Sequence, residues 1–261
     1  FLKPNILYNS SFIMAILGSV ASFNLPSVEI VNSFTGLGYL YTNQSIKARF
    51  MRSFVELLVR PFFRRRNVHA LFQNKDDRSE LENVGLVPQG SKIIRGSGVD
   101  IKRFSPLRYP LKRKQVVFGC AARLVQDKGI ECLIFAFRSL RNEKHNIKLR
   151  VAGSIDEKNP ASYRESDIEH WKLFVDVEIL DFVDDMPKFW RGCDVAVLPS
   201  KREGMPKALL EAASCGKPLI ASDVVGCRDL VEPGSNGLLF PVDNVEALKK
   251  IWLSQNESKN F

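Results

Sequence analysis

The sequence predicts an α/β protein built on two doubly wound parallel sheets. Short apolar runs alternate with longer helix-forming segments along the chain, which is the order that parallel strands joined by crossover helices require. The alternation stops at residues 100–115, where prolines and basic residues show little hydrophobic period. With 261 residues, 45% hydrophobic and 26% charged, the chain can bury one large core or two modest ones.

The first half predicts a strand, helix, strand unit followed by two more short strands. The strands are expected at residues 6–9, 28–33, 70–74 and 92–95. The apolar stretch at residues 12–25 contains Gly18 and is shorter than the roughly 20 residues that span a bilayer, so we expect a buried helix there. Residues 1–105 are therefore assigned to a first domain and residues 106–261 to a second.

The second half predicts a longer run of strand and helix units. Its helices are expected at residues 129–140, 187–192 and 207–214, and its strands at residues 116–120, 147–152, 177–180, 194–199, 218–221 and 237–240. Ligands of such sheets bind at the carboxyl ends of the strands. Both Gly204 and the turn at residues 122–123 follow predicted strands, so we expect a ligand cleft between the two sheets.

Residues 47–66 concentrate positive charge. They hold seven basic residues and one acid, Glu56, and so supply +6 of the chain's net charge of +9. Apolar residues recur among them at three- and four-residue intervals, which predicts an amphipathic helix with basic flanks: Phe50, Met51, Phe54, Val55, Leu58, Phe62 and Phe63. Two interpretations stay open, a segment bound to an anionic membrane surface and a core helix with a solvated basic side. No recognised nucleic-acid motif accompanies the charge, so nucleic acid is not an expected partner.

The cysteines favour a reducing cytoplasm. They are odd in number, scattered and without CxxC spacing, which argues against a disulfide framework and against a zinc site: Cys120, Cys132, Cys193, Cys215 and Cys227.

Two glutamates flank a predicted strand-to-helix turn. Glu203 lies in the turn at residues 199–206, and Glu211 lies on the helix that follows. The first N–H groups of a helix attract phosphate or hydroxyl oxygens, and a carboxylate accepts two hydrogen bonds from a vicinal diol. The two glutamates therefore suit a nucleotide-sugar, although two glutamates with no other supporting motif are more often ordinary solvated helix residues.

A basic pair lies on the loop after the first strand of the second half. Arg123 and Lys128 form a plausible diphosphate clamp, because charge-assisted hydrogen bonds to phosphate are strong and a leaving diphosphate gains negative charge. Alone, such a pair is usually a surface feature. Its position relative to the glutamate helix favours the clamp.

Together these motifs resemble the retaining glycosyltransferases of family 4, which have the GT-B fold. The resemblance rests on residues 121–129, the Glu203-x7-Glu211 element, residues 223–231 and residues 234–241. Other segments are similar to the branch that extends undecaprenyl-diphosphate-linked sugars in capsule, O-antigen or N-glycan assembly: residues 32–39, 72–74, 96–100, 159–162 and 184–187. Because family members have further opening strands, the N-terminal sheet is expected to be incomplete.

The resemblance implies a hexosyl or N-acetylhexosaminyl transferase. It would move a sugar from a nucleotide-sugar, usually a UDP-sugar, to a lipid-diphosphate-linked glycan with retention. The implied catalytic residues are Arg123 and Lys128 on the diphosphate and Glu203 on the sugar. The implied substrate-binding residues are Glu211 on the ribose hydroxyls, with Gly204, Met205, Pro206, Lys207, Phe182, Thr35 and Gly36. No cofactor or metal is implied, and Asp184-Asp185 is expected to cap a helix.

The implied location is cytoplasmic and peripheral on the inner face of the cytoplasmic membrane. The residues expected to face it are Arg60, Arg64, Arg65 and Arg66. Thr35-Gly36 stands where many family members have a histidine. Asp181 stands where the family usually has glycine, and its carboxylate would repel a diphosphate. Two alternatives remain, a truncated remnant that binds nucleotide-sugar without transferring it and a GT-B nucleotide-sugar epimerase.

Overall fold

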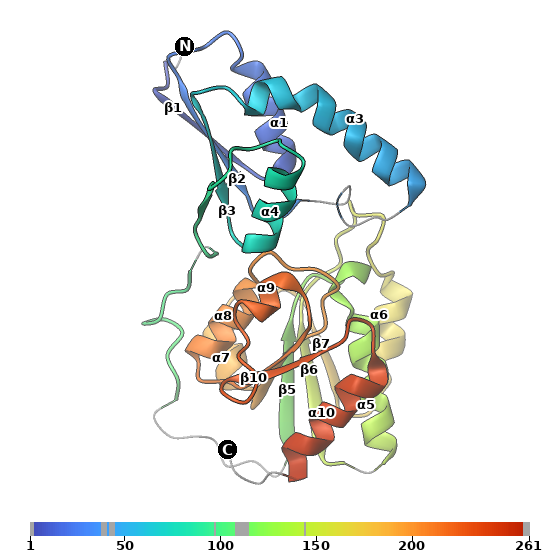
Figure 1. Cartoon of the computed structure of the whole chain (residues 1–261). Coiled ribbons are helices and arrows are strands. Elements are labelled where there is room, and N and C mark those ends of the chain that lie inside the picture. The colour runs from blue at the N-terminus through green and yellow to red at the C-terminus, as the bar shows by residue number, and fades with distance from the viewer. Residues whose placement is uncertain are drawn as a thin grey trace. The chain divides into compact units, whose positions relative to one another are not determined.

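The chain folds into two compact units, Phe1–Gly96 and Ser97–Phe261 (Figure 1). The structure is a computed structural model that describes residues 3–37, 41, 45–96, 98–107, 115–143 and 145–257. Both units are α/β with parallel strands, which confirms the predicted fold class. Residues 108–114 of the expected linker, and residues 38–39 of the segment at 32–39, lie outside the described part.

The start of the expected linker packs into the second unit. Phe104 is buried in that unit's core, and its carbonyl accepts the hydroxyl of Ser214. Arg191 donates to the carbonyl of Ser105 at 3.1 Å. These contacts agree with the assignment of Phe104 and Ser105 to the second compact unit, which begins at Ser97.

The first unit is a four-stranded sheet with the order β1-β2-β3-β4. Its elements are β1 (Ile6–Ser10), α1 (Phe12–Ala21), β2 (Glu29–Phe34), α3 (Ile46–Phe63), β3 (Val68–Phe72), α4 (Lys75–Asn83) and β4 (Lys92–Ile93). The strands follow one another without reversal, so right-handed crossovers put every connecting helix on one face. Figure 1 shows α1, α3 and α4 on the same side of the sheet. On β1, Ile6 and Tyr8 are exposed.

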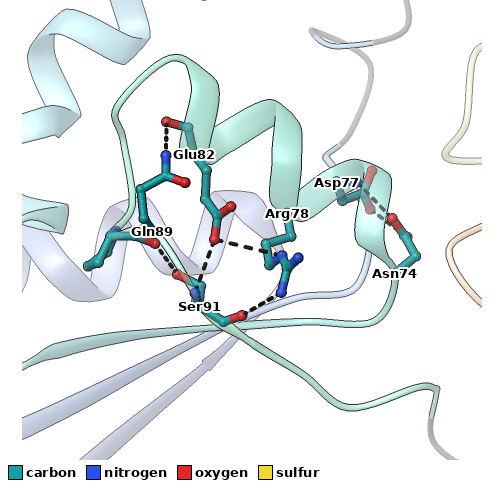
Figure 2. Close-up of polar contacts among 7 residues, drawn as sticks. Asn74, Asp77, Arg78, Glu82, Gln89 and Ser91 are labelled. Carbon is teal, nitrogen blue, oxygen red and sulfur yellow. Dashed lines mark hydrogen bonds and ion pairs between the residues drawn. The ribbon is translucent and has the colours of Figure 1, made fainter.

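Helix α4 accounts for a shift of the third strand. The sequence predicts a strand at residues 70–74, but Asn74 caps α4 by accepting the N–H of Asp77 at 2.8 Å (Figure 2). At the other end of the helix, Glu82 accepts the N–H of Ser91 at 3.0 Å, which fixes the chain before β4. The strand therefore begins and ends two residues earlier, at Val68 and Phe72.

The second unit is a six-stranded sheet with the order β10-β9-β8-β5-β6-β7. All six strands predicted for this half are present, and α6, α9 and α10 are additional helices. Its elements are β5 (Val116–Ala121), η1 (Gln126–Lys128), α5 (Ile130–Asn142), β6 (Ile147–Ala152), α6 (Glu165–Lys172), β7 (Val177–Leu180), α7 (Met186–Arg191), β8 (Val195–Leu198), α8 (Lys207–Ser214), β9 (Leu219–Ser222), α9 (Val225–Arg228), β10 (Gly237–Phe240) and α10 (Val245–Glu257).

Both faces of this sheet are covered. Strands β5 to β7 run outward in one direction and β8 to β10 in the other, so right-handed connections place α5 and α6 on one face and α7 to α9 on the opposite face. One core holds Phe118 stacked on Trp252, with ring centroids 4.5 Å apart. The other core holds Trp190 and Leu209. This arrangement is the doubly wound sheet that the sequence predicts.

Helix α3 (Ile46–Phe63) exposes four of the seven apolar side chains that the core-helix interpretation would bury, whereas Phe63 is buried and Val55 and Phe62 are half-buried. Its buried positions are Ala48, Glu56, Val59 and Phe63, and the carboxylate of Glu56 accepts the hydroxyl of Tyr41 at 2.9 Å. Large apolar residues with exposures between 53% and 76% occupy the remaining surface: Ile46, Phe50, Met51, Phe54, Leu57 and Leu58. Among the described residues, no helix combines the length and apolar character needed to cross a membrane.

Candidate functional site

The strand order of the second unit reverses between β5 and β8. Connections leave these two strands toward opposite faces of the sheet, which opens a crevice at their carboxyl ends where ligands of open α/β sheets bind. β5 ends at Ala121 and β8 ends at Leu198. Arg123 and Lys128 follow β5, and Glu203 follows β8. The topology therefore places all three predicted catalytic residues at one edge of the sheet.

Two of these residues form an ion pair. The Nζ of Lys128 lies 2.6 Å from Oε1 of Glu203, and only 20% and 11% of the two side chains are exposed. Gly129 follows Lys128 with a φ of 65°, and a Cβ there would lie 2.1 Å from the carbonyl oxygen of Pro199. Glycine is thus required both for the left-handed backbone and for the close approach of the two loops. That approach brings the cation and the carboxylate together.

Apolar, buried thiols lie near this pair. Burial raises the pKa of Cys120 to about 12 and the pKa of Cys227 to about 12, with smaller electrostatic effects from Lys128 and Glu203. Low polarity around an ion pair strengthens its attraction relative to water. A phosphate that approached Lys128 would benefit from the same environment.

The turn that carries Glu203 rests on the beginning of α9. The N–H of Gly226 donates to the carbonyl of Glu203 at 3.1 Å. Pro206 is buried and precedes Lys207, the first residue of α8, and within the described part of the chain no side chain caps this helix start. Its first backbone N–H groups therefore lie beside the predicted sugar and phosphate residues, with the partial positive charge of a helix N-terminus.

Glu211 lies on α8 with its carboxylate largely buried. The residue is 8% exposed, and Oε2 accepts the indole N–H of Trp190 at 3.4 Å. Its other oxygen is 3.9 Å from the Nζ of Lys207, whose side chain is 67% exposed. Glu211 is thus a nearly buried carboxylate on the helix that follows Glu203 in the chain.

Arg123 pairs with a carboxylate that sequence reasoning missed. Its Nη1 donates to Oδ2 of Asp156 at 2.7 Å, and 62% of the Arg123 side chain is exposed. Asp156 lies on the loop after β6. That loop approaches the Arg123 loop closely, since a Cβ on Gly153 would lie 1.8 Å from the carbonyl oxygen of Ala122. Among the described residues, Arg123 forms its ion pair with Asp156 and Glu203 forms its own with Lys128.

The segment at residues 159–162 holds Asp156 in place. The N–H of Asp156 donates to Oγ of Ser162 at 3.0 Å, and this hydroxyl donates to the carbonyl of Leu124 at 3.0 Å. The N–H of Gln126 donates to the carbonyl of Ala161 at 2.9 Å. The motif noted in the sequence therefore joins the loops after β5 and β6, which is the signal that could have identified Asp156.

The remaining predicted binding residues are spread over both units. Phe182 is 77% exposed in the turn after β7, and Asp185 caps α7 by accepting the N–H of Lys188 at 2.9 Å, as expected. In the first unit, Thr35 is exposed at the end of β2, and Gly36 follows with a φ of 141°.

The four arginines expected to face a membrane differ in their contacts. Arg64 and Arg66 are exposed. Arg60 is exposed as well and donates to the carbonyl of Val84 at 2.7 Å. Arg65 is half-buried and donates to the carbonyls of Ser19, Ser22 and Phe23 at 3.0 to 3.1 Å. Arg65 thus ties α3 to the end of α1.

A family model described as Glycosyl transferases group 1 matches residues 102–258, the stretch that carries the Lys128 and Glu203 pair. The chain belongs to the glycosyl transferases group 1 family. The resemblance that the motifs indicated is therefore confirmed, and the second unit is the glycosyltransferase domain.

Two curated relatives of this chain are named for lipid-linked sugar transfer. It is 26% identical over 238 residues to the N,N'-diacetylbacillosaminyl-diphospho-undecaprenol alpha-1,3-N-acetylgalactosaminyltransferase of Campylobacter jejuni, covering 86% of this chain and 60% of that protein. It is 25% identical over 259 residues to the UDP-Gal:alpha-D-GlcNAc-diphosphoundecaprenol alpha-1,3-galactosyltransferase of Escherichia coli, covering 94% of this chain and 64% of that protein. The chain spans less than two thirds of the length of these relatives.

A solved structure of Anabaena Alr3699/HepE in complex with UDP-glucose has the same fold. Its TM-score is 0.77 at 20% sequence identity, and the match covers 97% of this chain and 69% of that chain. At this identity the likeness shows the fold alone, which is the predicted GT-B fold.

Proposed function

We propose that this chain transfers a hexose or N-acetylhexosamine from a UDP-sugar to a lipid-diphosphate-linked glycan in bacterial polysaccharide synthesis. One observation carries the proposal. The Lys128 and Glu203 ion pair lies at the strand-order reversal, and Glu211 lies on the helix that follows Glu203. A cation for the diphosphate, a carboxylate for the sugar and a second carboxylate for the ribose diol are thus held on connected segments. The names of the two relatives support the acceptor class.

Each residue of the site has a chemical task in this proposal. Arg123 and Lys128 bind the diphosphate, and the amides of residues 204–207 bind sugar and phosphate oxygens. Glu203 accepts a sugar hydroxyl and Glu211 accepts the ribose hydroxyls. Phe182, which is exposed after β7, is assigned to substrate binding. In the first unit, Thr35 and Gly36 are assigned to the acceptor side.

The proposed transfer retains the anomeric configuration. The acceptor hydroxyl oxygen attacks the anomeric carbon from the face that the diphosphate leaves. The bond between that carbon and the diphosphate oxygen breaks, and the hydroxyl proton passes to the departing diphosphate. Negative charge grows on the diphosphate as this bond breaks, so Arg123 and Lys128 stabilise the transition state more than the ground state.

Arginine substitution tests the proposal directly. Arg123→Ala is expected to lower the transfer rate about 100-fold, because loss of one such donor costs about 3 kcal/mol of transition-state stabilisation. Arg138→Ala is the matched control, since Arg138 lies on α5 with its guanidinium over the ring of Phe174. The assay incubates the chain with UDP-sugars and short lipid-diphosphate acceptors and detects products by mass spectrometry.

The outcomes separate the alternatives. UDP binding without transfer to any acceptor identifies a non-transferring remnant, and conversion of the UDP-sugar without acceptor identifies an epimerase. An Arg123→Ala variant that transfers sugar at the parental rate would show that the diphosphate assignment is wrong.

We propose in addition that α3 binds the anionic cytoplasmic membrane surface. The only acid of α3, Glu56, is on its buried side, so the exposed surface combines large apolar residues with Lys47, Arg49 and Arg60, and Arg64 and Arg66 follow it. Each exposed cation contributes about 1 kcal/mol near an anionic surface, and the apolar side chains bury area in the interface. Arg65, which binds backbone carbonyls of its own unit, is left out of this surface.

Vesicle binding tests this surface. Phe54→Ser is expected to weaken sedimentation with vesicles of phosphatidylglycerol and phosphatidylcholine, whereas Leu173→Ser, which removes a 79% exposed apolar side chain in the second unit, leaves it unchanged. Binding should also fall with added salt. Equal binding of both variants would exclude α3 as the lipid contact.

A further inference from the structure

The carboxylate of Glu211 has one rigid, buried hydrogen-bond donor. The indole N–H of Trp190 donates to Oε2 at 3.4 Å, and Trp190 is fully buried, with an exposure of 0%. The other nearby donor, the ammonium of Lys207, is 3.9 Å away on a side chain that is 67% exposed. Only the indole is therefore held in one position by packing.

The surroundings of Trp190 fix the direction of this N–H. Its ring packs edge-to-face against Phe189, with centroids 5.0 Å apart. On the sheet side, the ring lies so close to β5 that a Cβ on Gly119 would be 3.3 Å from its Cζ3 atom. A close-packed interior leaves a ring of this size no alternative rotamer. The N–H of Trp190 therefore points to the same place whether or not a ligand is bound.

A carboxylate that binds a vicinal diol must present its oxygens in one rotational state. Glu211 has freely rotating side-chain bonds until a neighbour restricts them. A fixed donor behind Oε2 selects the rotamer and leaves Oε1 and the second lone pair of Oε2 available to accept two hydroxyls. It also compensates part of the cost of keeping a carboxylate in a nearly buried position.

We propose that Trp190 is a positioning residue that orients Glu211 toward the ribose 2′- and 3′-hydroxyls of the nucleotide. The inference rests on the proposed function, in which Glu211 binds the ribose. Trp190 itself does not touch the ligand. Its contribution is expected to depend on the presence of those two hydroxyls.

Trp190→Phe removes the N–H and keeps an aromatic ring in the core. The dissociation constant for UDP, measured by calorimetry, is expected to rise about 12-fold, the low end for loss of a hydrogen bond to a charged group. The dissociation constant for 2′,3′-dideoxy-UDP should not change, because this ligand gives Glu211 no diol to bind. A purely structural effect of the substitution would weaken both ligands alike.

Trp252→Phe is the matched control. Trp252 is equally buried, and its Nε1 has no hydrogen-bond partner among the described residues. The same loss of ring volume there should leave the ratio of the two dissociation constants at its parental value. A ratio that changes as much in Trp252→Phe as in Trp190→Phe would overturn the proposal.

A second replacement covers the case in which Trp190→Phe does not fold. Incorporation of benzothienylalanine in place of tryptophan exchanges each indole N–H for sulfur and preserves the ring shape, and the chain has 3 tryptophans. UDP affinity should fall while dideoxy-UDP affinity holds. Unchanged UDP affinity in protein that binds UDP would overturn the inference alone, whereas a parental protein that binds neither ligand would overturn the proposed function with it.

Discussion

Breaking the Lys128 and Glu203 ion pair is expected to destabilise the second unit more than breaking an exposed pair of the same chemistry. The two atoms are 2.6 Å apart, and the side chains are 20% and 11% exposed. Removing one member of a buried pair costs about 3–5 kcal/mol, and residual solvent access lowers this to about 2 kcal/mol for Lys128→Met. At about 2–4 °C per kcal/mol for a domain of this size, the melting temperature should fall by about 4–8 °C.

A double-mutant cycle isolates the pair. In Lys128→Met with Glu203→Gln, no uncompensated charge remains, so the double variant should be more stable than the sum of the single effects predicts, by about 1–2 kcal/mol. The exposed pair of Lys172 and Glu169 is the control, because its atoms are 2.8 Å apart and its side chains are 45% and 63% exposed. The coupling energy of that exposed pair should be smaller, because solvent screens its charges.

Urea unfolding and UDP calorimetry on each variant provide the two readouts. Both single variants and the double variant should lose UDP affinity, although the double variant recovers stability. If the double variant recovers stability but not UDP affinity, the ion pair stabilises the fold and its two side chains also bind the ligand. A coupling energy at Lys128 and Glu203 no larger than that of the exposed pair would refute the reasoning from burial.

Three further predictions follow from the structure. Gly129→Ala should cost stability and UDP affinity together, because its backbone is left-handed and its Cβ would meet Pro199; parental UDP affinity in calorimetry would contradict the close approach of the two loops. Burial raises the pKa of the Cys120 and Cys227 thiols to about 12, whereas the ordinary pKa of each thiol, which applies in the unfolded chain, is 9.0. Stability should therefore be intact below about pH 9 and fall as pH rises toward about 12, and a urea midpoint that is flat over this range would count against it. Asn74→Ala should lower the stability of the first unit by about 1 kcal/mol through loss of the α4 cap, and a thermal melt indistinguishable from the parental one would show that the cap is not formed.

Local patterns in the sequence were enough to predict the strands of the second unit. Residues 147–152, for example, alternate buried apolar and half-buried basic side chains over their first four positions, which is the pattern of a strand. The third strand of the first unit was placed two residues late, since Gln73 and Asn74 continue a run that looks extended, although the strand ends at Phe72 and Asn74 is the N-cap of α4. A capping side chain and a strand residue are not distinguished by hydrophobicity alone.

At the candidate site, too, some residues could be predicted from local sequence patterns and others could not. The motifs in the sequence predicted roles for Lys128 and Glu203, and the structure shows that these two side chains form an ion pair at 2.6 Å. Asp156 and Trp190 were missed because their roles depend on contacts between distant segments. A tryptophan in a short amphipathic helix is indistinguishable from any other core residue until its N–H is seen to meet a carboxylate.

The amino-acid order by itself determined the fold class, the family and the chemical groups at the site, because hydrophobic period, turn residues and motif spacing are local properties of a chain. Only the tertiary structure decided that the order of strands reverses between β5 and β8, that α3 turns its large apolar side chains outward and that Trp190 donates to Glu211. These features depend on which surfaces pack together and how closely, and packing is settled by the whole domain at once.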